Sequence, residues 1–330
     1  MKIVVLVGGL SSEREVSLAS GKAISKGLTE KGHVVVEIDL KDTLDVSVAG
    51  ARPGRNPGLA EFVSNSDVAS GELFFVALHG GAGEDGTVQA LLDIMGKPYT
   101  GSGMFASALC MDKIQSKRIF EHAGIPTPAW RVVGRSHVEG VEAAMSDLGG
   151  LPVVTKPRNQ GSTIGVSIIT EKKQVVPAVE EALKYSREIL VEEYIDGREI
   201  TVAILGDRPL PVVEIVPESG FYDYESKYTK GRSNYIVPAE IPDSVAEETR
   251  SVAMRAYRLT GCEDFGRVDF RLSAEGKPYC LEVNTIPGMT GTSLVPMAAR
   301  ADGMEFPELL DEICRLAVGR RKAVTKANAT

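Results

Sequence analysis

Polar side chains stand two residues apart at two places in the sequence: Arg267 and Asp269 within residues 267–272, and Glu282 and Asn284 at and just after the end of residues 279–283. Both segments alternate polar with apolar residues and flank Ser-Ala-Glu-Gly-Lys-Pro, which predicts a β-hairpin. If the loop is symmetric, the side chains that share one face are Asp269 opposite Glu282 and Arg267 opposite Asn284. Two carboxylates and an amide oxygen beside a cation suit Mg²⁺, which proteins hold through a few oxygens together with substrate phosphates. A solvated face with a cross-strand ion pair is the commoner fate of a charged hairpin.

The segment after the hairpin favours the metal interpretation. It reads Asn-Thr-Ile-Pro-Gly-Met-Thr from Asn284, and a glycine-containing turn there offers backbone N–H groups beside the proposed metal. The apolar side chains of the hairpin are predicted to take the opposite face, toward a core: Val268, Phe270, Leu281 and Val283.

Length and composition describe a globular protein of two or three domains. The chain has 330 residues, with 43% hydrophobic and 25% charged residues. The net charge of −8 argues against a nucleic-acid-binding surface, and no segment reaches membrane-spanning length. The four cysteines form no CxxC pair and no zinc-binding spacing, so we expect buried thiols in a reducing compartment, the cytoplasm: Cys110, Cys262, Cys280 and Cys314.

The N-terminal residues predict a β–α–β unit of an open parallel sheet. Residues 2–7 form a buried apolar run, residues 11–31 a helix, and residues 33–40 a second strand. Ser12 and Glu15 match a capping box, and this structural role is the one that the local sequence favours for Glu15. Because ligands bind at the carboxyl ends of such strands, Glu15 could instead hold a substrate ammonium group.

Residues 73–78 predict a further buried strand, which ends in His79 and a glycine-rich segment. A histidine at the carboxyl end of a parallel strand lies where ligands bind, although it could equally brace the loop through a hydrogen bond. Residues 43–70, by contrast, are polar and contain prolines and glycines, so we expect them to be mostly a surface connection.

A second glycine-rich loop joins two predicted strands, residues 151–156 and 166–169. Such a loop can cover phosphates with its N–H groups, and Lys156 at its base can contact a phosphate, although a plain turn is the simpler interpretation. A further hairpin is predicted from residues 189–194 and 199–205, with Glu192 and Glu199 near its turn. Two such glutamates could accept hydrogen bonds from a nucleotide, or be solvated.

Helices are predicted for the remaining periodic segments, residues 87–95, 106–123, 171–186, 242–259 and 306–318, with a frayed tail from Gly319. Residues 217–232 have no regular pattern. They place four aromatic residues among charges and two glycines, which is typical of a lid or binding loop.

Taken in order, these motifs resemble the D-alanine–D-alanine ligases of the ATP-grasp fold. The resemblance extends over residues 1–318. The segments that carry it are Gly-Gly-Leu-Ser-Ser-Glu-Arg-Glu-Val-Ser (8–17), His-Gly-Gly-Ala-Gly-Glu-Asp-Gly (79–86), Tyr-Thr-Gly-Ser-Gly (99–103), Met-Asp-Lys (111–113), Lys-Pro (156–157), Gly-Ser-Thr-Ile-Gly (161–165), Tyr-Asp-Tyr-Glu-Ser-Lys-Tyr (222–228), Gly-Arg-Val-Asp (266–269), Leu-Glu-Val-Asn-Thr-Ile-Pro-Gly-Met-Thr (281–290) and Ser-Leu-Val-Pro (293–296).

The resemblance implies an α/β, three-domain architecture. Residues 1–100 would form an N-terminal substrate-binding domain with an open parallel sheet. Residues 101–190 would form the central ATP-grasp lobe with the glycine-rich phosphate loop, and residues 191–330 the C-terminal ATP-grasp lobe with the lid loop and the metal site. A homodimer is implied as well, without nucleic-acid or membrane partners.

The resemblance also implies an activity. ATP would phosphorylate one D-alanine, and the amine of a second D-alanine would attack the acyl phosphate, giving a dipeptide for peptidoglycan synthesis. Two Mg²⁺ ions, or Mn²⁺, would be held by Asp269, Glu282 and Asn284. Phosphates would be bound by Lys113, Lys156 and Lys227, and adenine and ribose by Glu192 and Glu199. An oxyanion hole would be formed by Arg267 and Gly288, and the amino acids would be bound by Glu15, His79, Ser293 and Leu294.

The lid implied by the resemblance would close through hydrogen bonds that join Ser162 and Tyr228 to Glu15. Relatives that make D-alanyl-D-lactate carry phenylalanine at the matching lid position, so Tyr228 implies an amine acceptor. Two alternatives stay open: a related ligase with D-serine or D-lactate as acceptor, and a non-catalytic nucleotide- or amino-acid-binding module. The second alternative does not explain why Arg267, Asp269, Glu282 and Asn284 all occur together.

Overall fold

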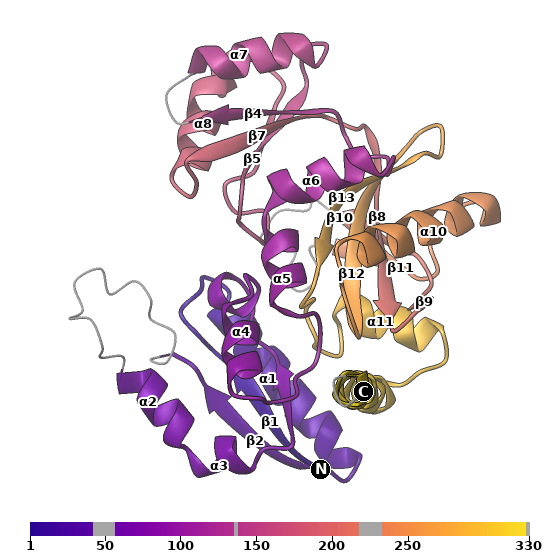
Figure 1. The fold of residues 1–330 in the computed structure, drawn as a ribbon. Helices are drawn as coiled ribbons and strands as arrows, with labels where there is room; N and C mark the ends of the chain where they lie inside the picture. Colours follow the sequence, from indigo (N-terminus) through magenta and orange to yellow (C-terminus); the bar gives the residue numbers. More distant parts are fainter. Residues whose placement is uncertain (42–56, 135–137, 218–232, 328–330) are drawn as a thin grey trace.

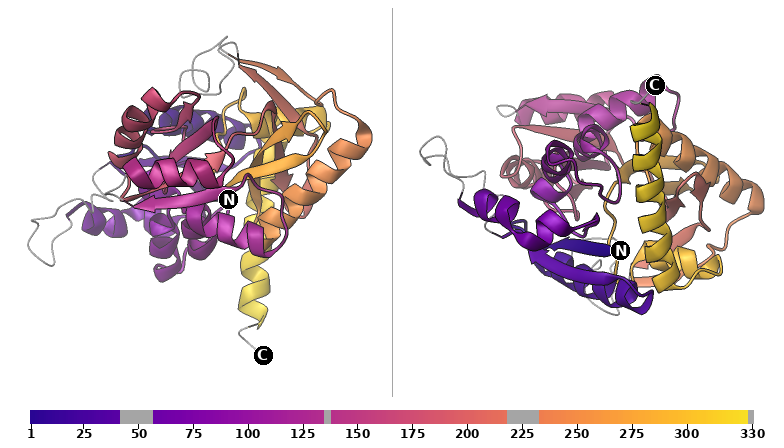
Figure 2. Two further views of the ribbon diagram at one scale, coloured as in Figure 1. Left: turned by 90° about the horizontal axis from the view of Figure 1, so that it is seen from above. Right: turned by 60° about the horizontal axis from the view of Figure 1, so that its bottom comes forward.

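The computed structural model describes residues 1–41, 57–134, 138–217 and 233–327. Three sheets with covering helices make up this part of the chain, as Figures 1 and 2 show. The sheets separate in space: one lies in the N-terminal part, one in the middle part and one in the C-terminal part. None of the helices within the described ranges is long and apolar enough to cross a membrane.

The N-terminal part is a parallel sheet buried on both faces, as the apolar run of residues 2–7 predicts. Its strands lie in the order β2-β1-β3, and both pairings are parallel. Ile3 and Val5 face one apolar cluster, whereas Val4 and Leu6 face another. The elements are β1 (Lys2–Val7), α1 (Arg14–Glu30), β2 (Val34–Asp39), α2 (Pro57–Ser64), α3 (Ser66–Ser70), β3 (Leu73–Val76), η1 (Gly81–Gly83) and α4 (Thr87–Ile94).

Two predictions for this part are wrong. Residues 43–56 of the expected surface connection lie outside the described residues, and its remainder, residues 57–70, forms α2 and α3. Asn65 caps α3 by accepting hydrogen bonds from the backbone N–H groups of its first turn. The expected capping box of Ser12 and Glu15 is absent. Helix α1 follows Glu13 as its N-cap residue without a side-chain cap, and Ser11 Oγ accepts the Glu13 N–H at 3.2 Å instead.

The middle part is an antiparallel sheet with the strand order β4-β7-β5-β6, covered by two helices. The glycine-rich loop joins β5 to β6, so the predicted hairpin at that loop is confirmed. The elements are α5 (Met104–Met111), α6 (Lys113–His122), β4 (Trp130–Gly134), α7 (Val138–Asp147), β5 (Val153–Pro157), β6 (Ser167–Ile169), η2 (Lys172–Gln174), α8 (Val175–Leu183) and β7 (Glu188–Glu193).

The helix predicted for residues 106–123 is two helices that meet at Asp112. This residue adopts an extended conformation, and its carboxylate accepts the N–H groups of Ile114 and Gln115 at 3.1 and 3.2 Å. Helix α6 therefore has a new N-terminus, and Lys113 is its first residue.

The C-terminal part is a six-stranded antiparallel sheet in the order β11-β10-β8-β12-β13, with the short β9 pairing with β8. Helix α10 packs on β13 and β12 (Figure 1). The elements are β8 (Gly197–Leu205), β9 (Arg208–Pro209), β10 (Val213–Pro217), β11 (Ser233–Ile236), α10 (Asp243–Leu259), β12 (Phe265–Ser273), β13 (Pro278–Asn284), α11 (Leu294–Ala301) and α12 (Phe306–Ala327).

The hairpin predicted across residues 196–197 is wrong, since β7 and β8 belong to different sheets. Strand β7 pairs with β4 and β5, whereas β8 pairs with β10 and β12. The chain crosses between the sheets here, and β8 begins where the backbone is tightly packed. A Cβ on Gly197 would lie 2.0 Å from the carbonyl oxygen of Leu272, and its φ is +145°.

The predicted register of the β12–β13 hairpin is confirmed at its functional end. Arg267 pairs with Asn284, and Asp269 pairs with Glu282. A bulge then shifts the pairing, so that Phe270 lies opposite Cys280 rather than Leu281. Cys280 consequently takes the core position, and the prediction that Leu281 faces the core is wrong.

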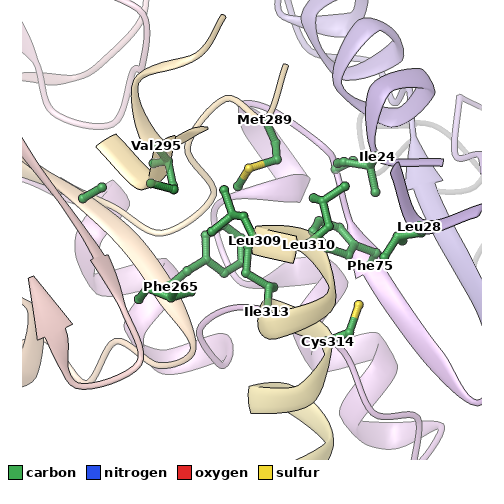
Figure 3. Close-up of a cluster of buried hydrophobic side chains, with 14 of the residues drawn as sticks. Ile24, Leu28, Phe75, Phe265, Met289, Val295, Leu309, Leu310, Ile313 and Cys314 are labelled. Atoms are coloured by element: carbon green, nitrogen blue, oxygen red, sulfur yellow. The ribbon is translucent and has the colours of Figure 1, made fainter. Parts of the chain in front are cut away.

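Helix α12 joins the N-terminal and C-terminal parts through a shared core (Figure 3). Its buried side chains Leu310 and Ile313 belong to one cluster with Leu28 of α1, Phe75 of β3 and Phe265 of β12. The helix continues to Ala327, so the predicted end at residue 318 is wrong. All four cysteines are buried free thiols, as predicted.

Arg320 and Asp264 form a polar contact at the edge of this core. The Asp264 carboxylate, 4% exposed, accepts the Gly101 N–H at 2.9 Å and lies 3.4 Å from the Arg320 guanidinium. Burial outweighs the nearby arginine and raises the pKa of Asp264 from 3.8 to about 6. The folded protein therefore binds a proton more tightly at this site than the unfolded chain does.

We predict that Asp264→Asn stabilises the protein at neutral pH but not at pH 4. A carboxyl whose pKa is raised on folding favours the folded state at low pH, and this contribution is lost as pH rises toward 6. Asparagine resembles the protonated acid and tolerates the positive φ of 60° at this position. Urea unfolding at pH values from 4 to 7.5 measures the effect. As the pH rises, the free energy of unfolding of the variant should come to exceed that of the wild type by up to about 3 kcal/mol. A stability difference that does not change with pH would contradict the assignment.

Candidate active site

The predicted hairpin face carries a connected set of charges. Arg267 donates to both oxygens of Asp269 at 2.8 Å, from Nε and Nη2. Asn284 Nδ2 donates to the same carboxylate at 2.9 Å, and the Thr201 hydroxyl donates at 2.6 Å. Arg267 and Asp269 are only 14% and 13% exposed, so the desolvated carboxylate depends on these donors.

Lys113 connects this face to the glycine-rich loop. Its ammonium group lies 3.0 Å from Glu282 Oε2 and donates to the backbone carbonyl of Gln160 at 2.7 Å. Its own N–H donates to the Arg158 carbonyl at 2.9 Å. The first residue of α6 is therefore attached to both the hairpin and the loop.

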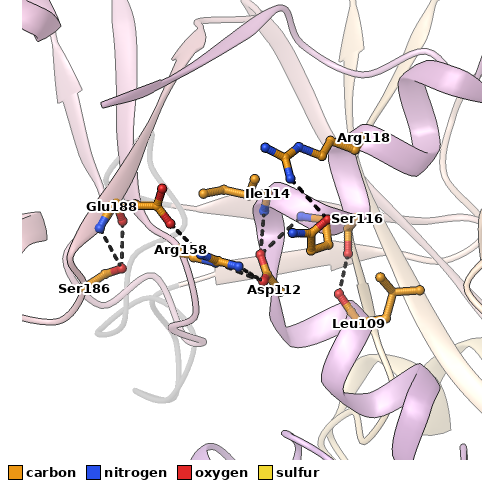
Figure 4. Close-up of polar contacts among 9 residues, drawn as sticks. Leu109, Asp112, Ile114, Ser116, Arg118, Arg158, Ser186 and Glu188 are labelled. Carbon is orange, nitrogen blue, oxygen red and sulfur yellow. Dashed lines mark hydrogen bonds and ion pairs between the residues drawn. The ribbon is translucent and has the colours of Figure 1, made fainter. Parts of the chain in front are cut away.

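An ion-pair cluster holds the base of the loop in place (Figure 4). The Arg158 guanidinium donates from Nε to Asp112 Oδ2 at 2.9 Å, and its other end pairs with Glu188 at the start of β7. Asp112 and Glu188 hold the pKa of Arg158 above its ordinary value, with the hydrogen bond to Asp112 as the main cause. Because Asp112 also caps α6, Arg158 fixes the loop relative to Lys113.

The donor set on the hairpin fits a divalent cation in type. Asp269, Glu282 and Asn284 supply two carboxylates and an amide oxygen at neighbouring positions of the register. Within the part of the chain that the structure describes, no group of three or more His, Cys, Asp or Glu side chains could hold a metal by itself. The hairpin residues therefore suit an ion whose coordination is completed by phosphate oxygens, as is usual for Mg²⁺.

A cavity opens between the middle and C-terminal sheets. Apolar walls come from Val154, Ile168 and Leu281, which explains why Leu281 does not need a core position. Its predicted polar lining residues are Lys113, Lys156, Glu192, Glu199, Asp269 and Glu282.

Glu192 lies between two lysines in the wall of this cavity. Its Oε2 is 2.6 Å from Lys156 Nζ, and its Oε1 is 2.9 Å from Lys117 Nζ. Burial alone would raise the pKa of Glu192, but the two ammonium groups outweigh it and the pKa is lowered. Lys117 is not among the predicted site residues. The only signal for it in the sequence is its spacing of one helical turn from Lys113, which places both lysines on one face of the helix.

A second cavity lies between the N-terminal part and the C-terminal sheet, and it shares Gly161 and Glu282 with the first. The two cavities therefore adjoin at the glycine-rich loop and the hairpin. The predicted residues that line the second cavity are Glu15, His79, Ser162, Arg267, Glu282, Asn284, Gly288, Ser293 and Leu294.

The glycine-rich loop contacts the N-terminal part through Glu13 and not through Glu15. The Ser162 hydroxyl donates to Glu13 Oε1. Glu13 is 6% exposed, whereas Glu15 is an exposed residue of the first turn of α1. The predicted hydrogen bond between Ser162 and Glu15 is therefore wrong. The loop adopts positive φ at Ser162 and Thr163, 50° and 62°, a backbone strain typical of functional sites.

His79 is buried beside this contact. Its Nε2 lies 3.1 Å from the Ser20 hydroxyl, and its Nδ1 lies 3.6 Å from Glu84 Oε1. Burial raises the pKa of Glu84, although His79 opposes this shift. His79 is thus hydrogen-bonded, as the interpretation of a residue that braces the loop predicts, and it also lines the cavity.

Gly288 and Ser293 come together at the N-terminus of α11. A Cβ on Gly288 would lie 3.2 Å from Ser293 Oγ, so the backbone and hydroxyl are close neighbours. Ser293 Oγ accepts the Thr290 N–H at 3.0 Å and makes no cap hydrogen bond to α11. Lys227 and Tyr228, two further predicted residues, lie outside the described residues.

Known proteins resemble this chain over nearly its whole length. Family models for the D-ala D-ala ligase N-terminus and C-terminus match residues 2–102 and 119–315. The D-alanine–D-alanine ligase of Moorella thermoacetica is 46% identical over 327 residues, covering 96% of this chain and 99% of its own. That of Bordetella pertussis is 46% identical over 312 residues, covering 93% and 92%.

Solved structures of the same kind superpose closely. The ATP complex of D-alanine–D-alanine ligase from Bacillus anthracis has a TM-score of 0.82 at 32% identity, covering 98% of this chain and 99% of its own. The VanG D-Ala:D-Ser ligase from Enterococcus faecalis has a TM-score of 0.78 at 29% identity, covering 96% and 99%. The chain belongs to the D-alanine–D-alanine ligase family and has its ATP-grasp fold.

Proposed function

We propose that the protein joins two D-alanine molecules to D-alanyl-D-alanine for peptidoglycan synthesis and converts ATP to ADP and phosphate. The observation that carries the proposal is the meeting of two cavities at one hairpin face. One cavity combines two lysines and apolar walls with glutamates and suits ATP, while the other combines carboxylates and hydroxyls with Arg267 and suits amino acids. The face between them carries the charged residues needed for transfer between the two.

In the first step the carboxylate of one D-alanine attacks the γ-phosphorus of ATP, giving D-alanyl phosphate and ADP. Lys113 and Lys156 would hold the phosphates as point charges. Glu192 and Glu199 would accept hydrogen bonds from adenine and ribose. Two Mg²⁺ ions, or Mn²⁺, held by Asp269, Glu282 and Asn284, would supply neutralisation of the phosphate charge.

In the second step the amine of the other D-alanine attacks the acyl phosphate, and phosphate leaves after the tetrahedral intermediate. Arg267 and the Gly288 N–H would stabilise the negative oxygen of that intermediate. Ser293 and Leu294, at the start of α11, would position the second substrate through its carboxylate. Lys227 and Tyr228 would contribute from the lid segment.

The ammonium group of the first D-alanine requires an anion, and Glu13 is better placed than Glu15 to supply it. Glu13 is buried, lines the cavity and accepts from the loop that would cover the phosphates. His79 lies in the same cavity wall. We also propose a homodimer in the cytoplasm, where the four free thiols would stay reduced.

We predict that the purified protein, given ATP, Mg²⁺ and D-alanine, releases phosphate and forms D-alanyl-D-alanine. Mass analysis of reactions that contain D-alanine with D-serine or D-lactate measures the acceptor preference. A protein that makes mainly the D-serine or D-lactate product is the alternative ligase, and one that binds ATP without releasing phosphate is a binding module.

Replacing Glu13 should affect substrate binding far more than replacing Glu15. In Glu13→Gln the amide can still accept from Ser162, but the charge that would pair with the ammonium group is lost. The KM of D-alanine should rise by roughly tenfold or more, as for other charged hydrogen bonds. Glu15→Gln is the matched control at an exposed position two residues away, where the change should stay within about twofold. Equal effects of the two variants would contradict the assignment.

The hairpin carboxylates should be required for turnover. Asp269→Asn or Glu282→Gln removes a negative ligand while keeping the size of the side chain, and kcat should fall by roughly a hundredfold or more. Titrating Mn²⁺ by electron paramagnetic resonance in the presence of ATP tests the cause directly. Near-normal turnover together with unchanged Mn²⁺ binding would exclude these residues as ligands.

A further inference from the structure

Lys117 is a buried lysine that the proposed chemistry does not yet use. It lies on α6 four residues after Lys113, so both side chains project from the same face of the helix. Lys113 lines the cavity between the sheets, whereas Lys117 lies behind the cavity wall and is 1% exposed. Lysine is almost never buried to this extent unless it is paired.

The Lys117 ammonium group has three partners. It lies 2.9 Å from Glu192 Oε1, donates to the Thr127 hydroxyl at 2.8 Å and donates to the Pro128 carbonyl at 3.1 Å. Thr127 and Pro128 accept hydrogen bonds from the ammonium group, whereas its contact with Glu192 is an ion pair. Desolvation of two buried ions offsets much of their attraction, so stability alone gives little reason to retain this pair. Burial lowers the pKa of Lys117, while Glu192 opposes that shift.

Glu192 connects Lys117 to the cavity through a second ion pair. Its second oxygen lies 2.6 Å from Lys156, which is 13% exposed and lines the cavity where the phosphates would bind. The three side chains form a row of cation, anion and cation with a net charge of +1. With Lys117 in place, one Glu192 oxygen is held away from Lys156, and the Lys156 ammonium group keeps donors for a phosphate.

We propose that Lys117 is a positioning residue for ATP, which acts by holding Glu192 so that Lys156 remains available to the phosphates. Without Lys117, the full charge of the buried carboxylate would act on Lys156 and draw it from the nucleotide. This inference rests on the proposed function only in taking ATP as the nucleotide.

The connection between the two sheets supports the same role. The Thr127 hydroxyl accepts a hydrogen bond from the Lys117 ammonium group and donates one to the Cys280 carbonyl of β13 at 2.7 Å. Pro128, the other backbone partner, lines the cavity. Lys117 thus ties the segment that leads into β4 to both β7 and β13, the strands that flank the nucleotide cavity.

We predict that Lys117→Met weakens ATP binding by roughly tenfold, which is within the range for coupled residues of one charge network. The KM of D-alanine should stay within about twofold of the wild-type value. Calorimetric titration of the full-length protein with ATP and Mg²⁺, without amino acid, measures the effect independently of ligation. Lys117→Gln, which keeps N–H donors, serves as a second neutral variant if the methionine variant does not fold. The matched control is Lys97→Met, because Lys97 donates to the Ala69 carbonyl in the N-terminal part.

A double-mutant cycle separates positioning from a merely structural role. In the Glu192→Gln protein there is no charge for Lys117 to hold, so adding Lys117→Met should change ATP affinity by less than about twofold. The same tenfold loss in that protein, or no loss in Lys117→Met alone, would overturn the proposal. If the wild type binds ATP with this coupling but makes no dipeptide, the proposed function fails while the role of Lys117 stands.

Discussion

The pairing of β12 with strands on both sides is the constraint on which the site depends. Strand β12 is paired with β8 along its whole length and with β13 from Arg267 to Leu272, so its residues cannot shift along either partner. This register places Arg267 and Asp269 beside Asn284, while Val268 is fully buried on the opposite face. A shift by one residue would move the charged face into the core, so the core and the site fix the same register.

The N-terminal part reaches this face by two different kinds of contact. The first is apolar: α12 packs against α1 and joins Leu28, Phe75 and Phe265 in one core. The second is polar and local, the hydrogen bond from Ser162 to Glu13. The extended core fixes where the N-terminal part lies, whereas the hydrogen bond only sets the position of a loop that has positive φ values. Rigid packing thus positions the cleft, and the hydrogen bond between Ser162 and Glu13 joins the glycine-rich loop to the N-terminal part.

Local patterns in the sequence predict the strands, most helices and the register of the β12–β13 hairpin, because alternation and turn residues determine them. They do not predict which strands pair over a distance. Residues 189–194 and 199–205 resemble a hairpin, yet tertiary packing places them in different sheets. The bulge after Asp269 cannot be read from alternation, so Leu281 was assigned to the wrong face. The proposed domain boundaries at residues 100 and 190 stay predictions.

The choice between Glu13 and Glu15 shows a similar limit at the site. Both residues precede or begin α1, and the capping-box pattern directs attention to Glu15. A single residue of difference in where the helix begins turns one carboxylate inward and leaves the other exposed. Helix ends depend on tertiary contacts, here the hydrogen bond from Ser162, so the sequence alone favours the wrong glutamate.

Charge balance explains how one site can serve both phosphate and metal. Two carboxylates of the hairpin face already lie against cations of the chain: Asp269 faces Arg267, and Glu282 faces Lys113. In the proposed reaction, a phosphate bound to Lys113 would weaken the ion pair between Lys113 and Glu282, and that carboxylate would then favour a divalent cation. Nucleotide and metal binding would therefore be coupled through the same ion pairs. These pairs lie in a partly desolvated face, where an exchange of one ionic partner for another would change the local charge little.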